Sequence, residues 1–173
     1  MALINTTTTG VLGSTFYGDG SGDLTVQQNG VTVNKITRAP TFSAYPSTNQ
    51  TITTGTNTKV LFGTERWDTD NCFDNGSAGR FTPTVAGYYH VDCHAYVGGA
   101  ANTFLNLFKN GSAYARGSQI SGTTSMCLLT TTVFLNGTTD YLEMFLTNST
   151  GGNVSVDAYD FTTTFAAFLV RFA

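Results

Sequence analysis

The chain carries little charge. Asp, Glu, Lys and Arg together make up 11% of its 173 residues, against roughly 25% in an ordinary soluble domain. The eight Lys and Arg residues are scattered and the formal net charge is −3, so the basic stripe that phosphate binding requires is missing. These features argue against nucleic acid as a partner, and Thr, Ser, Asn and Gly must supply the polar surface.

Long apolar runs and cysteine pairs are also missing. No stretch approaches the ~20 apolar residues of a membrane span, and the first residues lack the basic and apolar regions of a secretory signal. We therefore expect that the protein is made in the cytoplasm and does not insert into a membrane. The three cysteines, Cys72, Cys93 and Cys127, contain no C-x-x-C pair, which predicts buried free thiols rather than a disulfide framework or a zinc knuckle.

Catalytic signatures are missing as well. The chain has two histidines, close together in one segment, and it shows no Gly-x-Ser-x-Gly elbow, phosphate loop or paired-glutamate motif. The sequence therefore predicts a protein that is not an enzyme and that needs no cofactor.

What the sequence does contain is strand signals, and the segment 79–97 shows them best. Its first half is a turn marked by Pro83 and Gly87, and its second half alternates between two kinds of side chain. Because successive side chains of a strand point to opposite faces, the apolar set should face a core and the polar-aromatic set should face outward. The apolar set is Tyr89, Val91, Cys93, Ala95 and Val97, and the other set is Tyr88, His90, Asp92, His94 and Tyr96.

Similar short strand patterns recur along the main domain, separated by Thr, Asn and Gly. We predict strands at 59–62, 104–108, 128–135, 141–146 and 165–170, with a turn at Asn110-Gly111 after the second of them. No helical periodicity occurs, so the pattern indicates an all-β sandwich or jelly roll.

Residues 1–38 differ from the rest and form a predicted N-terminal arm. Apolar and polar residues alternate on both sides of Asn29-Gly30, a dipeptide that favours the type I′ turn of a β-hairpin. Counted outward from this turn, Val26 is predicted to face Val33, with Leu24 and Val31 on the same side. A two-stranded ribbon is marginal alone, so we expect these four residues to attach the arm to another body.

Several motifs of residues 40–172 follow one another in the order of a known family. They are Pro40-Thr41-Phe42-Ser43-Ala44, Phe73, Gly79-Arg80-Phe81, Pro83, Gly87-Tyr88-Tyr89, His94, Leu107-Phe108-Lys109-Asn110-Gly111 and Phe165-Ala166-Ala167-Phe168-Leu169. This ordering resembles the globular head of complement component one subunit q, which is related to tumour necrosis factor. The chain departs from the family in a longer loop before Asp140 and in the absence of collagen-like repeats.

The resemblance implies a jelly roll of about ten antiparallel strands over residues 39–173, assembled as a homotrimer. An aromatic content of 13% is more than one small core needs, and an interface around a threefold axis would use the surplus. On this interpretation Phe81 and Phe168 belong to the core.

Metal binding is a weaker alternative. The spacing His90-x-Asp92-x-His94 has suitable zinc ligands, and alternate side chains of a strand lie ~6.5–7 Å apart. An ordinary polar face explains the same residues, and we favour it. Calcium binding by loop carboxylates is a second alternative, although no EF-hand spacing occurs and solvated carboxylates are the favoured interpretation. The candidates are Asp68, Asp70, Asp74, Asp140, Asp157 and Asp160.

Three functions remain after these exclusions. The chain resembles structural proteins of bacteriophage virions, so the first hypothesis is a capsid decoration, cement or head-fibre protein exposed on the particle, whose arm binds the major capsid protein or another virion component. The second is the receptor-binding tip of a short tail fibre, which would recognise a host surface glycan or protein through Tyr45, Trp67, Tyr114 and Tyr159. A signalling or innate-recognition ligand is a third and more distant hypothesis.

Overall fold

The computed structural model describes residues 14–18, 24–28, 31–36, 39–149 and 152–173, and all regular elements among them are β-strands. Contacts divide the chain into two units, Met1–Ala39 and Pro40–Ala173. No helix with the length and apolarity of a membrane span occurs within the described ranges. The all-β class predicted from the sequence is confirmed.

The N-terminal unit contains a three-stranded antiparallel sheet with the order β1-β2-β3. Its strands are β1 (Ser14–Gly18), β2 (Leu24–Gln28) and β3 (Val31–Ile36). The sequence predicted β2 and β3 as a hairpin but missed β1. The predicted turn at Asn29-Gly30 lies outside the described residues.

The predicted register of this hairpin is wrong. Val26 lies opposite Asn34 rather than Val33, because the pairing shifts between Val26 and Gln27. One extra residue in β3, Val33, accounts for the shift, as in a β-bulge. The attachment role of Leu24, Val26, Val31 and Val33 stays a prediction.

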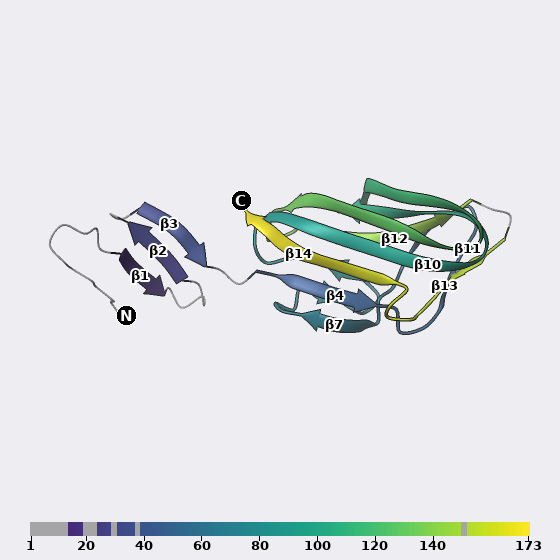
Figure 1. Cartoon of the computed structure of the whole chain (residues 1–173), viewed down its shortest axis with the longest axis horizontal. Coiled ribbons are helices and arrows are strands. Elements are labelled where there is room, and N and C mark those ends of the chain that lie inside the picture. The colour runs from purple at the N-terminus through teal and green to yellow at the C-terminus, as the bar shows by residue number, and fades with distance from the viewer. Residues whose placement is uncertain (1–13, 19–23, 29–30, 37–38, 150–151) are drawn as a thin grey trace. The chain divides into compact units, whose positions relative to one another are not determined.

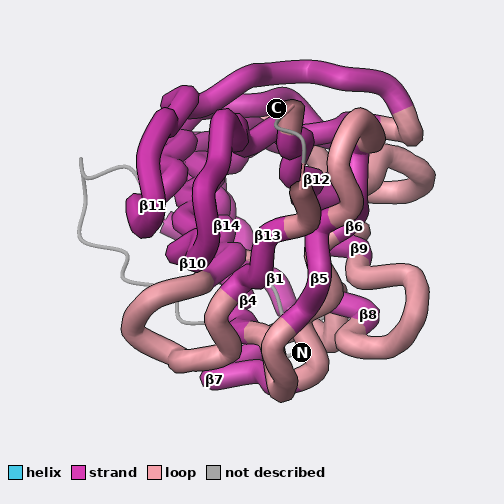
Figure 2. The backbone as a smooth tube through the Cα atoms, turned by 90° about the vertical axis from the view of Figure 1, so that its right-hand side faces the viewer, coloured by secondary structure: helices cyan, strands magenta, loops and turns pink. Residues whose placement is uncertain are grey.

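The C-terminal unit is a sandwich of antiparallel strands (Figures 1 and 2). Strands β7, β4, β14 and β10 follow one another in one layer, and β11 pairs with the other side of β10. The strands are β4 (Thr41–Tyr45), β5 (Gln50–Ile52), β6 (Asn57–Lys59), β7 (Thr64–Asp68), β8 (Phe73–Asp74), β9 (Arg80–Phe81), β10 (Gly87–Lys109), β11 (Ser112–Leu135), β12 (Leu142–Asn148), β13 (Val154–Val156) and β14 (Thr164–Phe172).

The long strands β10 and β11 connect the two layers. Residues Gly87–His94 of β10 pair with β14, whereas Thr103–Lys109 pair with β12. Gly98 and Gly99 lie at the change of partner, where the β10–β11 pairing also shifts register. Gly99 has a φ of 112°, which a residue with a side chain rarely adopts. At the far end, the predicted turn is confirmed, since Asn110 and Gly111 have φ values of 54° and 76°.

The core lies between the layers and is rich in stacked phenylalanines. The ring of Phe42 stacks on Phe73 at 4.6 Å and on Phe81 at 4.5 Å between centroids, and Phe165 meets it edge-on at 5.0 Å. The apolar set predicted on the segment 89–97 is fully buried. That prediction is confirmed, and it orients β10 with its polar-aromatic side outward.

Two predictions about the core region are wrong. The segment 59–62 is not a strand, because β6 ends at Lys59. The Val60 N–H still donates to the Met144 carbonyl of β12, and Val60 and Phe62 fill the core. Phe168 is 50% exposed, although we predicted it in the core. Strand alternation explains this: Phe165 and Ala167 point inward on β14, so Phe168 points outward.

Candidate functional site

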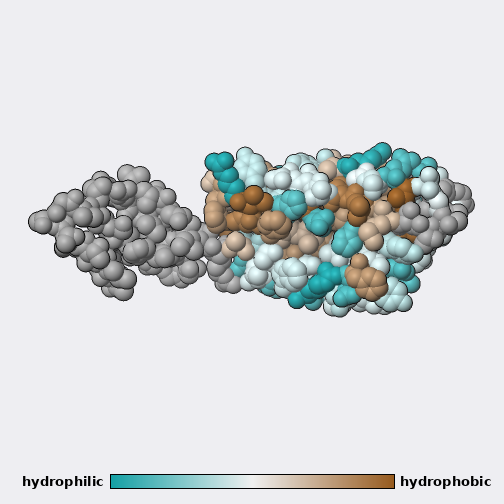
Figure 3. Space-filling model, in the orientation of Figure 1, coloured by the Kyte–Doolittle hydropathy of each residue, from teal (hydrophilic) through white to brown (hydrophobic). Residues whose placement is uncertain are grey.

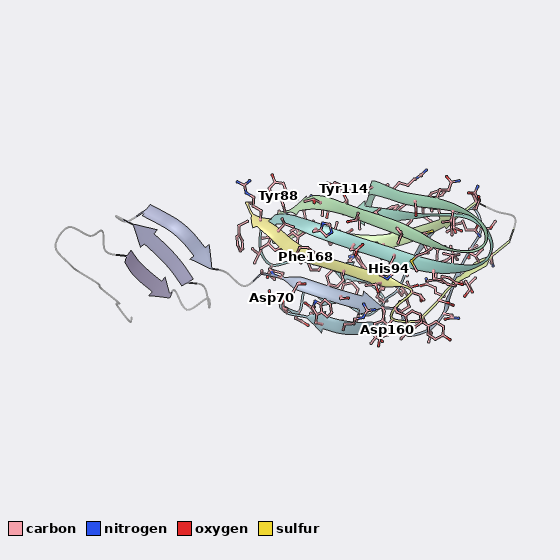
Figure 4. The ribbon with its side chains drawn as sticks, viewed as in Figure 1. Asp70, Tyr88, His94, Tyr114, Asp160 and Phe168 are labelled. Carbon is pink, nitrogen blue, oxygen red and sulfur yellow. The ribbon has the colours of Figure 1, made fainter. Side chains whose placement is uncertain are left out.

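The outward side of β10 and its neighbours forms a continuous surface, which we name the β10 face. The strand register places Phe168 of β14 opposite His90, and Phe134 and Leu128 of β11 opposite Tyr88 and His94. Figure 4 labels Tyr88, Phe168 and His94 along this face. The β10 face consists of Tyr88, His90, Asp92, His94, Tyr96, Met126, Leu128, Thr130, Thr132, Phe134, Ala166 and Phe168.

Apolar side chains dominate one end of this face. Figure 3 shows apolar surface gathered over the C-terminal end of β14. There Val170 and Phe172 are exposed, and they line an open depression of about 530 Å³ together with Tyr88, Ala173 and one charged residue, Arg171. The rings of Tyr88 and Phe134 pack against each other at 5.5 Å between centroids. An exposed cluster of this kind marks an interaction surface more often than a solvated one.

Histidines occupy the middle of the β10 face. His90 Nε2 lies 3.1 Å from Thr130 Oγ1, and the His90 ring lies 5.1 Å from Phe168. Burial lowers the pKa of His94; Asp92 opposes this effect and Arg66 adds to it. His94 is therefore neutral at physiological pH, which suits packing against another surface.

Among the described residues, no group of three or more His, Cys, Asp or Glu side chains is arranged to hold a metal ion. Three of the calcium candidates instead accept hydrogen bonds that hold turns or join two loops. Asp68 accepts from the Phe73 N–H at 2.7 Å, Asp74 from the Gly76 N–H at 2.8 Å, and Asp140 from Asn110 Nδ2 at 2.7 Å. These carboxylates shape loops.

The four aromatics predicted to contact a ligand come from different elements. Tyr45 at the end of β4 lies under Arg66, with the guanidinium 5.3 Å from its ring. Trp67 of β7 donates to Thr41 Oγ1 at 3.3 Å, and Tyr114 of β11 donates to the Thr132 carbonyl at 3.3 Å. Tyr159 lies in the loop before β14. Their role in binding stays a prediction.

The structure adds an aromatic that the sequence analysis missed. Phe161 is 75% exposed, and its ring stacks on Tyr159 at 5.7 Å between centroids and an interplanar angle of 22°. The sequence could have indicated this exposure, because Phe161 lies between Asp160 and Thr162 and has no apolar neighbour that would extend a strand.

All three cysteines are free and buried, as predicted. Burial raises the pKa of Cys72 and Cys93 and raises that of Cys127 to about 12. The thiols are therefore protonated at neutral pH and poor nucleophiles. They contribute to packing.

The fold and the β10 face define a jelly roll of the tumour necrosis factor type. Murine APRIL at pH 8.5 superimposes with a TM-score of 0.61 at 9% identity, covering 77% of this chain and 100% of that one. The Eiger TNF of S. frugiperda gives a TM-score of 0.52 at 14% identity, covering 78% of this chain and 93% of that one. No family model and no curated protein matches the sequence. The predicted fold is confirmed, and these likenesses concern the fold alone.

Proposed function

We propose that the C-terminal unit assembles as a homotrimer through its β10 face. The observation that carries this proposal is the exposure of large apolar side chains on one side of the sheet, with Leu128 at 53% and Phe168 at 50%. Removing such side chains from water contributes roughly 25 cal/mol per Å² of apolar area. A closed cyclic assembly covers the same surface on every copy.

The trimer serves as a structural protein of a bacteriophage virion, a capsid decoration, cement or head-fibre protein. Two features support this role. The lightly charged surface suits close packing with identical copies. The N-terminal unit has its own sheet and is divided from the jelly roll by the pattern of contacts. In this role the N-terminal unit binds the capsid, and the jelly roll lies on the outside of the particle.

Light scattering tests the assembly. We expect the wild-type chain to show three times its chain mass of 18.4 kDa. The variant Phe168→Asp places charges in the proposed interface and should be monomeric, while its circular dichroism stays native because the side chain is half exposed. Leu61→Asp is the matched control, since Leu61 is 41% exposed and lies between β6 and β7, outside the β10 face. A monomeric wild type, or a trimeric Phe168→Asp, contradicts the proposal.

A second candidate function is the receptor-binding tip of a short tail fibre. The observation that favours it is the pair of exposed, stacked rings of Tyr159 and Phe161, because exposed aromatics are typical of sites that bind sugars or proteins. Binding of the purified protein to host cells, blocked by surface polysaccharide, separates this role from decoration.

A further inference from the structure

The loop of residues 157–163 exposes the rings of Tyr159 and Phe161 to solvent, and hydrogen bonds fix its backbone. The Tyr159 carbonyl accepts hydrogen bonds from the N–H groups of Thr162 and Thr163 at 3.1 and 3.2 Å. Both ends of the loop are also anchored: the Asp157 N–H donates to the Tyr96 carbonyl, and Thr164 Oγ1 donates to the Asp160 carbonyl. Stacked exposed rings on an anchored loop form a preorganised platform, so little entropy is lost when a ligand binds.

One hydrogen bond connects this loop to an uncharged depression. Asn49 Oδ1 accepts a hydrogen bond from the Ala158 N–H at 2.9 Å, and Asn49 is also part of the lining of an open depression of about 420 Å³. Exposed Thr48, Asn75 and Ser77 add hydroxyl and amide groups to the lining, and Leu61 is its large apolar side chain. None of the described residues that line it carries a charge.

We propose that the Tyr159–Phe161 platform and the connected amide-lined depression bind an uncharged, hexose-containing glycan. The apolar face of a pyranose ring packs on an aromatic ring, while its hydroxyl groups exchange hydrogen bonds with amides and hydroxyls. The site therefore supplies both an aromatic surface for the sugar ring and hydrogen-bonding groups for its hydroxyls. Its volume falls in the range of about 300–1,000 Å³ that small-molecule sites occupy.

Charge excludes the other glycan classes. Sialylated, sulfated or phosphorylated sugars need Arg or Lys partners, and the lining has none. The carboxylates of Asp157 and Asp160 on the loop repel anions and accept hydrogen bonds from sugar hydroxyls. Arg66 lies near the base of the loop, where its guanidinium donates hydrogen bonds to Thr164 Oγ1 and Ser43 Oγ. The same guanidinium lies over the ring of Tyr45.

This inference deepens the second candidate function and rests on it. The test uses the full chain on immobilised neutral oligosaccharides of glucose, galactose and mannose, beside sialylated and sulfated ones. We expect binding to at least one neutral series. Phe161→Ala should weaken it roughly 30-fold, the usual effect of truncating a central aromatic anchor. Asn75→Asp should also weaken it, because it replaces the amide N–H donors with a carboxylate that only accepts hydrogen bonds, without changing the shape of the depression.

Gln119→Ala is the control and should bind like the wild type, because this exposed side chain lies on β11, outside both the loop and the depression. Wild-type protein that binds no neutral oligosaccharide, or only anionic ones, overturns the inference, as does Phe161→Ala that binds normally. Light scattering on the same samples keeps the outcomes apart. A trimer without glycan binding refutes this site alone, and a Phe161→Ala chain that loses its trimer mass shows that the platform is a subunit contact.

Discussion

At the scale of single residues, position along a strand decides burial, because successive side chains point to opposite faces of the sheet. Every second side chain from Tyr89 to Val97 is buried. The same rule applied to β14 would have placed Phe168 outside. The error came from reading an aromatic residue as a core residue, whereas strand parity relative to Phe165 decides which face it occupies.

Glu143 shows what alternation could not predict. This carboxylate is buried, and its Oε1 accepts from Lys59 Nζ at 2.6 Å and from Arg80 Nε at 2.8 Å. Burial alone would raise the Glu143 pKa, but the hydrogen bonds and charges of Lys59 and Arg80 outweigh it and lower the pKa. Its partners lie 84 and 63 residues away in sequence, so no local pattern could reveal the cluster.

The lowered pKa of Glu143 predicts an acid-dependent loss of stability. A depressed folded-state pKa contributes stability that is complete above the ordinary Glu value of 4.5 and is lost as the pH falls through the lowered value. At pH 7, Glu143→Gln should lower the free energy of unfolding by about 1–2 kcal/mol, a modest value because both cations are partly exposed. Urea unfolding of both proteins from pH 7 to pH 3 measures the difference.

That difference should shrink as the pH falls below 4.5, because the wild-type carboxylate is then protonated too. The control is Glu65→Gln on β7, since Glu65 forms no ion pair with a residue in the described ranges. Its unfolding free energy should stay close to that of the wild type at pH 7. An undiminished deficit of Glu143→Gln at pH 3 would show that lost packing, rather than ionisation, explains the effect.

At the scale of elements, the longer strands were predictable and the short polar ones were not. Strands β5, β7, β8, β9 and β13 have two to five residues each. Segments such as Thr64-Glu65-Arg66-Trp67-Asp68 carry no apolar alternation, and they become strands because β4 offers them an edge to pair with. The continuity of β10 through Gly98-Gly99 was equally hidden, since two glycines normally indicate a turn.

The β11–β12 loop was recognised in the sequence by its extra length, and the structure gives the reason for its shape. Asn136 Oδ1 accepts hydrogen bonds from the N–H groups of Thr138, Thr139 and Asp140 at 2.9–3.0 Å. Asp140 in turn holds Lys109 Nζ at 2.9 Å. The loop is therefore closed by side-chain hydrogen bonds, and Gly137 lies within it.

Gly137→Ala should destabilise the protein more than the same change at Gly55. Both glycines have a positive φ, +72° and +75°, so the backbone strain is matched at about 1 kcal/mol. A Cβ on Gly137 would lie 2.6 Å from the Val85 carbonyl carbon, whereas one on Gly55 meets no atom within 4 Å. We expect Gly137→Ala to lose roughly 2 kcal/mol more in chemical unfolding. Equal losses would mean that the loop moves away from Val85 and Ala86 freely.

At the scale of the whole molecule, the fold followed from the order of motifs along residues 40–172, whereas the assembly and the biological role do not follow from the fold. Jelly rolls host unrelated functions. What distinguishes this chain is the combination of an apolar β10 face, an exposed aromatic loop and a separate N-terminal sheet. Each of these points to a different contact, and they can be tested independently.

The attachment role of the N-terminal unit gives the last prediction. If this unit binds the capsid, deletion of residues 1–39 should leave a jelly roll that still folds, because the division between units falls at Ala39 and Pro40 and the core is formed within the second unit. In light scattering, the truncated protein should still show three times the mass of its own chain. In electron micrographs of particles assembled with it, it should no longer appear on the capsids. Full-length protein added to the same particles is the control. Truncated protein that still decorates capsids, or full-length protein found only on tails, would show that attachment lies elsewhere and would favour the tail-fibre function.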